Sequence, residues 1–147
     1  MTETQKILLV EDNPDDQALT LKAFRKHIEE ETVNLMVVND GQEAIDYLES
    51  VSFESNHSID LILLDLKMPK VGGLEVLKYI RNTTKTKFVP VVILTTSLEE
   101  SDLVNAYRLG VNSYIRKPIE FSEFLAQIQA IGNYWLSLNQ LPREEIC

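Results

Sequence analysis

The sequence predicts an α/β fold in which helices cover both faces of a five-stranded parallel sheet. Five short aliphatic runs alternate along the chain with five segments whose apolar residues recur at helical spacing. The run Leu-Ile-Leu-Leu at 61–64 has no polar residue on either face, which is typical of a central strand of a parallel sheet. Alternating strands and helices imply right-handed crossovers, and therefore parallel strands between two helical layers.

Length and composition fit one globular domain. The chain has 147 residues, of which 44% are hydrophobic and 25% charged. We expect a core over about 5–131, followed by an extended last helix and a short tail at 132–147.

Charge and apolar content exclude several classes of partner. The net charge of −9, from 23 acidic and 14 basic residues, argues against nucleic acid or an anionic membrane as the main partner. No apolar run approaches the roughly 18 residues of a membrane span. The single cysteine, Cys147, permits no internal disulfide and fits a cytoplasmic location.

The remaining elements follow from the apolar pattern. Further strands are expected at 6–10, 34–38, 89–94 and 113–116. Helices are expected at 14–27, around 44–48, around 74–80, at 99–109 and from 121 through 138. The last helix should bury a stripe formed by Phe121, Phe124, Leu125, Ile128 and Ile131. Asn13 should cap the first helix, with Asp15 and Asp16 as first-turn acids.

Polar side chains follow the strands at their carboxyl ends. Glu11 and Asp12 follow the first strand, Asp65 the third, Thr95 the fourth and Lys117 the fifth. In the flavodoxin-like strand order 2-1-3-4-5, the first and third strands flank the switch point where such sheets carry their sites. Three carboxylates should therefore converge there.

Such a carboxylate cluster requires compensation. Two carboxylates about 4 Å apart repel by about 4 kcal/mol at an effective dielectric of 20. A raised pKa, a cation or a bound metal relieves this repulsion. Oxygen ligands without His or Cys suit Mg²⁺, and a lysine, a hydroxyl and a metal around one carboxylate suit phosphoryl transfer onto it. The alternative is that Lys117 merely neutralises the acids as a buried ion pair.

The ordered set of motifs resembles a response-regulator receiver domain of two-component systems. The matching stretches are Leu-Leu-Val-Glu-Asp (8–12), Asp-Gly-Gln-Glu-Ala (40–44), Leu-Leu-Asp-Leu-Lys-Met-Pro (63–69), Gly73, Pro-Val-Val-Ile-Leu-Thr (90–95) and Lys-Pro (117–118). Within the family, the chain is most similar to stand-alone regulators paired with cyanobacterial phytochromes. That narrower resemblance lies in Leu-Leu-Asp-Leu (63–66), Leu-Thr-Thr-Ser (94–97), Gly-Val-Asn-Ser-Tyr (110–114) and the aromatic pair at 134–135.

The resemblance implies a function as well as the fold. Asp65 would accept a phosphoryl group from a phytochrome-like sensor histidine kinase, and the chain would be a signalling protein rather than a turnover enzyme. Mg²⁺, or Mn²⁺ or Ca²⁺ in its place, would be held by Glu11, Asp12, Asp65 and the backbone carbonyl of Lys67. The signal would pass to a downstream protein or a further phosphorelay member.

The resemblance also assigns the phosphoryl-binding and switch residues. Lys117 would pair with the phosphoryl oxygens, and Thr95, with Thr96 beside it, would contact the phosphoryl group. Tyr114 would turn inward behind Thr95 as the second switch residue. The bond before Pro118 would be cis and would aim Lys117 into the site.

Apolar side chains towards the end of the chain have two interpretations. Tyr134, Trp135 and Leu138 lie beyond a minimal receiver and, with Tyr107, would form a homodimer surface on the last two helices. The alternative is that the final residues fold back and extend the core.

Three other functions compete with phosphorylation. A flavin-binding module would need a glycine- and hydroxyl-rich phosphate loop after the first strand, where Glu-Asp-Asn-Pro-Asp-Asp (11–16) would repel phosphate. A phosphohydrolase with an aspartyl nucleophile would often carry an acid at the place of Lys67. A phosphorylation-independent protein-binding module of receiver fold is the third alternative, although the presence of Asp65 and Lys117 weighs against it.

Overall fold

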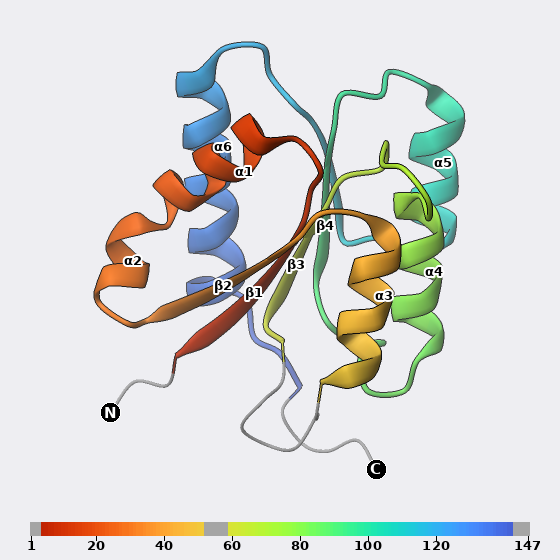
Figure 1. The fold of residues 1–147 in the computed structure, drawn as a ribbon, viewed down its shortest axis with the longest axis horizontal. Coiled ribbons are helices and arrows are strands. Elements are labelled where there is room, and N and C mark those ends of the chain that lie inside the picture. Colours follow the sequence, from red (N-terminus) through yellow and green to blue (C-terminus); the bar gives the residue numbers. More distant parts are fainter. Residues whose placement is uncertain (1–3, 52–58, 143–147) are drawn as a thin grey trace.

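A five-stranded parallel sheet forms the centre of the molecule (Figure 1). The structure, a computed structural model, describes residues 4–51 and 59–142. Cys147 lies outside these residues. The strands are β1 (Gln5–Val10), β2 (Val33–Val38), β3 (Leu61–Leu64), β4 (Val91–Thr95) and β5 (Ser113–Arg116). Their order is β2-β1-β3-β4-β5, which confirms the predicted topology.

Helices cover both faces of the sheet, as predicted (Figure 1). They are α1 (Pro14–Ala23), α2 (Arg25–Glu29), α3 (Gly41–Ser50), α4 (Gly73–Asn82), α5 (Glu100–Arg108), α6 (Phe121–Asn133) and the short π-helix η1 (Tyr134–Leu138). The α3, α4 and α5 helices pack on one face, and α1 and α6 on the other. No helix in the described ranges combines the length and apolarity needed to cross a bilayer.

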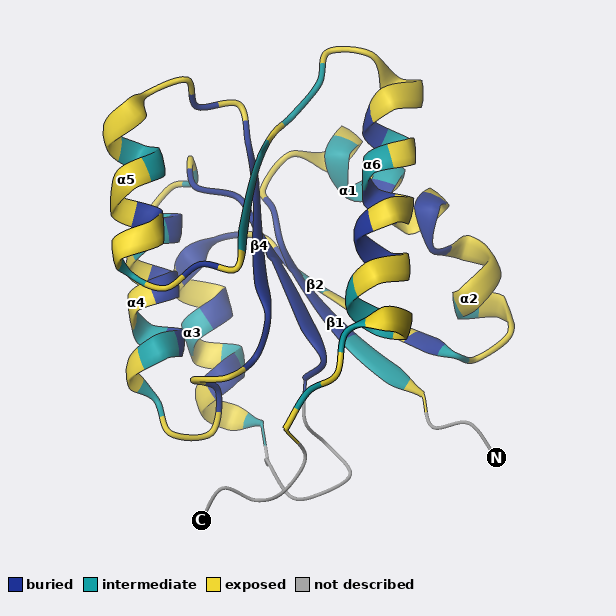
Figure 2. Ribbon diagram, turned by 180° about the vertical axis from the view of Figure 1, so that it is seen from behind, coloured by how far each residue is buried: buried dark blue, intermediate teal, exposed yellow. Residues whose placement is uncertain are grey.

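Alternate residues of the inner strands supply the two cores. On β1, Leu8 and Val10 face the α3–α5 layer, whereas Ile7 and Leu9 face the α1–α6 layer. All four residues of β3 are buried, and Figure 2 shows the inner strands enclosed on both sides. A strand buried on both faces cannot show polar alternation, which explains the continuous aliphatic run at 61–64.

Two expected element boundaries differ from the structure. The expected first helix divides at Phe24, whose side chain enters the core, into α1 and α2. The fourth strand begins at Val91 rather than at 89. Pro90 has no N–H to donate to the sheet, although its carbonyl accepts a hydrogen bond from the Ile62 N–H.

The C-terminal helix also departs from the predicted pattern. Phe121 is 68% exposed, because it is the first residue of α6 and lies before the part of the helix that packs on the sheet. The regular α-helix ends at Asn133 and continues as η1, with the Asn139 N–H donating to the carbonyl of Tyr134.

Arg81 ties together three segments near the C-terminal end of α4. Its guanidinium donates hydrogen bonds to the carbonyls of Gly110 (2.8 Å), Val89 (2.8 Å) and Lys87 (3.3 Å), and to Oδ1 of Asn112 (2.7 Å). The same Asn112 oxygen accepts the Val91 N–H, so the clamp reaches the first residue of β4. A planar side chain with five donors suits this task, whereas lysine would not reach all four acceptors.

We predict that Arg81→Ala lowers the free energy of unfolding by about 2 kcal/mol, because it leaves the partly buried Val89 carbonyl without its donor and removes three further charge-assisted hydrogen bonds. Urea denaturation followed by circular dichroism measures this change. Arg108→Ala removes an exposed arginine at the end of α5 and is the matched control. Equal losses in the two variants would contradict a structural role for the clamp.

Candidate functional site

Backbone hydrogen bonds of the sheet continue past the ends of the strands and fix the backbone of the site residues. The Glu11 N–H donates to the carbonyl of Val38, and the Asp65 N–H donates to the carbonyl of Val10. On the other side of the sheet, the Lys117 N–H donates to the carbonyl of Thr95. Because the parallel register continues past the strands, residues from different strands meet at one edge, as the sequence predicted.

The Lys117 ammonium lies at the centre of this edge. Its Nζ is 2.7 Å from Oδ2 of Asp16, 2.8 Å from Oε1 of Glu11 and 3.4 Å from Oδ2 of Asp65. The lysine side chain is only 7% exposed. Burial disfavours its charge, but the hydrogen bonds that it donates to Asp16 and Glu11 outweigh this effect and raise the pKa of Lys117. The ammonium therefore stays charged and balances several acids at once.

Glu11 is the most deeply buried acid of the site. Burial raises its pKa to about 7, although the hydrogen bond and charge of Lys117 act in the opposite direction. Its other carboxylate oxygen accepts the Asn13 N–H at 3.1 Å. The glutamate side chain thus reaches both the lysine and the loop before α1.

A divalent cation fits three of the carboxylates. One oxygen each from Glu11, Asp12 and Asp65 lies within 4.8 Å of the other two. Glu11 and Asp65 are buried and Asp12 is exposed, so the cluster is open to solvent on the Asp12 side. Carboxylate oxygens are the ligands that hard divalent cations prefer. The carbonyl of Lys67 as a fourth ligand remains a prediction.

Local packing holds Asp65 at the end of β3. Its Oδ1 accepts the N–H of Leu66 at 2.8 Å, which leaves Oδ2 towards Lys117. Gly73, at the start of α4, passes close to the carbonyl of Asp65: a Cβ atom at this position would lie 2.3 Å from that oxygen. The next loop can therefore approach the aspartate only because residue 73 lacks a side chain.

The hydroxyl groups predicted to contact a phosphoryl group differ in their surroundings. Thr95 is fully buried, and its Oγ1 accepts the N–H of Ser97 at 3.2 Å. Thr96 is exposed at the rim. The Tyr114 hydroxyl is already buried, and it has no hydrogen-bond partner among the described residues.

The predicted cis bond before Pro118 is wrong. The described residues contain no cis peptide bond. The trans and cis forms before proline differ by only about 0.5–1 kcal/mol, so the local contacts decide between them. With the trans bond, Lys117 keeps its backbone hydrogen bond to Thr95 and still places its ammonium among the acids. A cis bond is therefore not required to aim the lysine.

The β3–α4 loop is linked to the start of α5. The Lys67 ammonium lies 3.2 Å from Oδ2 of Asp102 and 3.6 Å from Oε1 of Glu99. The same Asp102 oxygen accepts the hydroxyl of Ser97 at 2.6 Å. These contacts connect the loop after Asp65 with the segment after Thr95.

The residues of the predicted dimer surface divide into two groups. Tyr107, Tyr134 and Leu138 are 53%, 48% and 63% exposed. Trp135 instead packs, partly buried, against the core between the sheet and α6, as the fold-back alternative expects. Its ring meets that of Tyr134 edge to face, with centroids 4.9 Å apart.

Comparison with known proteins identifies the family of this chain. The family model described as "response regulator receiver domain" matches residues 7–129. The chain belongs to the response-regulator receiver family. The probable methanogenesis regulatory protein FilR2 of Methanothrix harundinacea is 39% identical over 136 residues, which cover 92% of this chain and 86% of FilR2. Response regulator Rcp1 of Synechocystis is 37% identical over 138 residues, which cover 92% of each protein.

Solved structures give the same family. The phosphorylated cyanobacterial phytochrome response regulator RcpA has a TM-score of 0.85 and 40% identity, with 95% of this chain and 99% of that chain covered. The Mn²⁺-bound form of Rcp1 has a TM-score of 0.81 and 35% identity, with 94% and 99% covered. These findings confirm the predicted resemblance to cyanobacterial phytochrome regulators.

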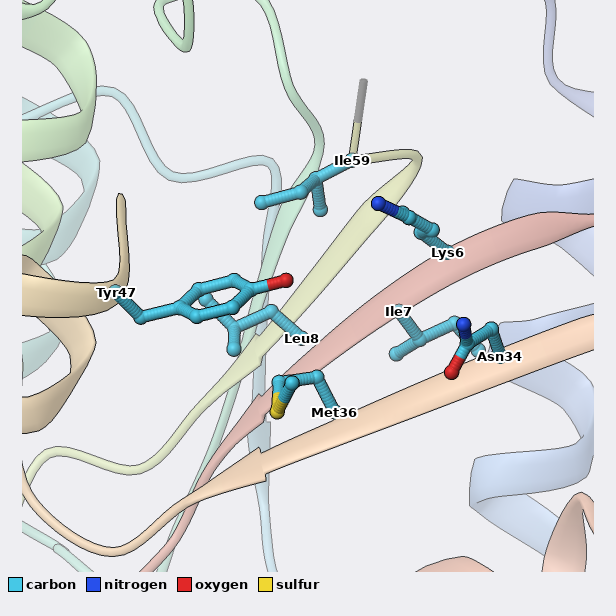
Figure 3. Close-up of a pocket in the computed structure, with 7 residues that line it drawn as sticks. All are labelled: Lys6, Ile7, Leu8, Asn34, Met36, Tyr47 and Ile59. Atoms are coloured by element: carbon cyan, nitrogen blue, oxygen red, sulfur yellow. The ribbon is translucent and has the colours of Figure 1, made fainter. Parts of the chain in front are cut away.

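A second depression lies elsewhere on the receiver. A pocket of about 150 Å³ is lined by β1, β2, Tyr47 of α3 and Ile59 (Figure 3). Its polar groups belong to Lys6, Asn34 and Tyr47, and none is a carboxylate. None of the acids around Lys117 lines this pocket, so it has no part in the chemistry of the site.

Two contacts of the site were not predicted. Asp16 was interpreted only as a first-turn acid, but it makes the shortest contact to Lys117. Its position in the first turn of the helix that follows the Glu11–Asp12 pair was the available signal, since that turn begins at the same edge of the sheet. The Ser97–Asp102 hydrogen bond had no comparable signal in the sequence.

We predict that Gly73→Ala destabilises the fold by about 1–3 kcal/mol, the range typical of overpacking, because the new methyl group would collide with the carbonyl of Asp65. Urea denaturation gives the change in stability. Gly72→Ala is the matched control, because its Cβ would meet the Leu66 carbonyl at an ordinary 3.7 Å. Similar stabilities for the two variants would show that the loop does not need the close approach.

Proposed function

We propose that the chain is a stand-alone response regulator that accepts a phosphoryl group on Asp65, with Mg²⁺, from a phytochrome-like sensor histidine kinase. The observation that carries this proposal is the position of Asp65 at the end of β3, beside a buried ammonium and two further carboxylates. The similarity to Rcp1 over 92% of both chains, and to phosphorylated RcpA, supports the stand-alone form and the phytochrome-like donor.

Phosphoryl transfer requires an exposed route to a charge-balanced carboxylate. One oxygen of Asp65 would form the new P–O bond while the P–N bond of a phosphohistidine donor breaks, giving an acyl phosphate on Asp65. The electron pair of the broken bond would stay on the histidine nitrogen, and a proton taken from solvent by the donor ring would let it leave as a neutral imidazole. A divalent cation held by Glu11, Asp12, Asp65 and the Lys67 carbonyl would supply positive charge to the phosphoryl oxygens. Lys117 would donate a hydrogen bond to a phosphoryl oxygen. This bond would stabilise the negative charge of the phosphoryl group as it is transferred to Asp65.

The switch would begin at Thr95. The phosphoryl group adds a charge of about −1.5 to −2 and three strong acceptors. The Thr95 hydroxyl would donate to one of these oxygens, and Thr96 lies beside it at the rim. Ser97, which contacts Thr95, is hydrogen-bonded to Asp102 of α5, so a change at Thr95 would reach this helix. Rearrangement of Tyr114 and α5 would then present a changed surface to a downstream protein or a further phosphorelay member.

Intact-mass measurement after incubation with acetyl phosphate and Mg²⁺ tests this function. We predict a single phosphoryl adduct on the wild type, absent without the metal or after chelation. Asp65→Asn keeps the shape of the side chain but removes the nucleophilic carboxylate, and it should give no adduct.

Asp15→Asn is the matched control for that experiment. It removes the same charge from an exposed residue of α1 and should label like the wild type. An adduct that persists in Asp65→Asn would place the acceptor elsewhere. No adduct on the wild type would leave the protein-binding alternative, in which the receiver acts without phosphorylation.

We predict further that the regulator forms a homodimer through the surface defined by Tyr107, Tyr134 and Leu138, because these exposed apolar side chains lie on α5 and η1. Light scattering of Leu138→Glu should then show a lower mass than the wild type. Leu21→Glu changes an exposed leucine on α1 and should leave the mass unaltered. A monomeric wild type, tested with and without phosphorylation, would contradict the dimer.

A further inference from the structure

All three N–H donors of the Lys117 ammonium are committed in this structure. An ammonium has three donors and no acceptor. The three hydrogen bonds go to Asp16 at 2.7 Å, Glu11 at 2.8 Å and Asp65 at 3.4 Å. Because the side chain is 7% exposed, water has little access to the amine. A hydrogen bond to any new group must therefore replace one of the present three.

The three partners are not equivalent. Glu11 and Asp65 belong to the carboxylate cluster that fits a divalent cation, whereas Asp16 lies outside it. A bound cation would draw charge from Glu11 and Asp65 and weaken their hold on the ammonium. Asp16 would keep its own charge entirely for Lys117, and its contact is already the shortest.

The backbone of Asp16 is fixed by the start of α1. Its N–H donates to Oδ1 of the capping residue Asn13 at 3.0 Å, and its carbonyl accepts the hydroxyl of Thr20 at 2.8 Å. The carboxylate, which is 22% exposed, therefore approaches Lys117 from a fixed point on the helical layer rather than from the sheet. The ammonium is the group that has to move.

We propose that Asp16 is a positioning residue that holds Lys117 in a resting place and opposes its delivery to a phosphoryl group on Asp65. This inference rests on the proposed phosphoacceptor function. Transfer of the ammonium from Asp16 to a phosphoryl oxygen exchanges one anionic acceptor for another. Asp16 thereby sets how strongly the regulator favours its unphosphorylated arrangement, without touching the phosphoryl group itself.

The test uses the full chain, saturating Mg²⁺ and beryllium fluoride, which forms a phosphoryl-like adduct on an aspartate. Titration followed by ¹⁹F NMR gives the apparent affinity for the adduct. Asp16→Asn should bind about ten-fold more tightly than the wild type, the order expected when a charge-assisted hydrogen bond no longer competes for the lysine. Asp16→Glu, which restores the carboxylate, should return the affinity towards that of the wild type.

Asp15→Asn is again the matched control, because it removes one negative charge from the same helical turn and its side chain makes no polar contact with the described residues. It should shift the affinity less than two-fold, since exposed charges are well screened. The Asp16→Asn substitution should preserve the fold, because the helix cap uses the backbone N–H of this residue and not its side chain.

The outcomes separate the proposal from the function on which it rests. Binding to Asp16→Asn that equals binding to Asp15→Asn, or that is weaker than wild type, would overturn the resting role of Asp16 while leaving the phosphoacceptor function in place. Absence of the adduct on the wild type itself would overturn both. Tighter binding to Asp16→Asn alone, reversed in Asp16→Glu, would establish the role.

Discussion

The carboxyl-end edge of the sheet in this receiver depends on the ion pairs of the buried Lys117 ammonium. Carboxylates from β1, α1 and β3 approach closely enough to repel strongly in a partly desolvated site, and the lysine from the end of β5 compensates them. The parallel register makes this arrangement possible, because hydrogen bonds continue one residue past the strands. A metal or a phosphoryl group that binds at this edge would have to compete with the hydrogen bonds that Lys117 already makes to these carboxylates.

Much of this arrangement could be predicted from the sequence. Five aliphatic runs separated by amphipathic segments predicted a parallel sheet between two helical layers, because crossover handedness leaves few topologies. The strand order was taken from the flavodoxin-like arrangement of such sheets. The residues directly after β1, β3 and β5 were predicted to meet for the same reason, and Glu11, Asp65 and Lys117 do so. A residue at the end of a parallel strand has its place determined by topology.

Other features depended on information that pattern does not contain. Asp16 reaches Lys117 through the direction in which α1 leaves the sheet, and the isomer of the bond before Pro118 depends on small local energies. Phe121 has the right spacing for a buried stripe but stands at the solvent-facing start of α6. Trp135 and Tyr134 are neighbours in sequence, yet only Trp135 packs on the core, because consecutive residues of a helical turn point in different directions.

The Arg81 clamp changes what the similarity at 110–114 means. Gly110 and Asn112, which helped to mark this chain as a relative of phytochrome regulators, are acceptors for the arginine rather than members of the charged edge. The Gly-Val-Asn stretch of this chain therefore belongs to the scaffold, where it anchors the start of β4 to the end of α4. The resemblance of this stretch to phytochrome regulators is thus a resemblance of the scaffold and not of the charged edge around Lys117.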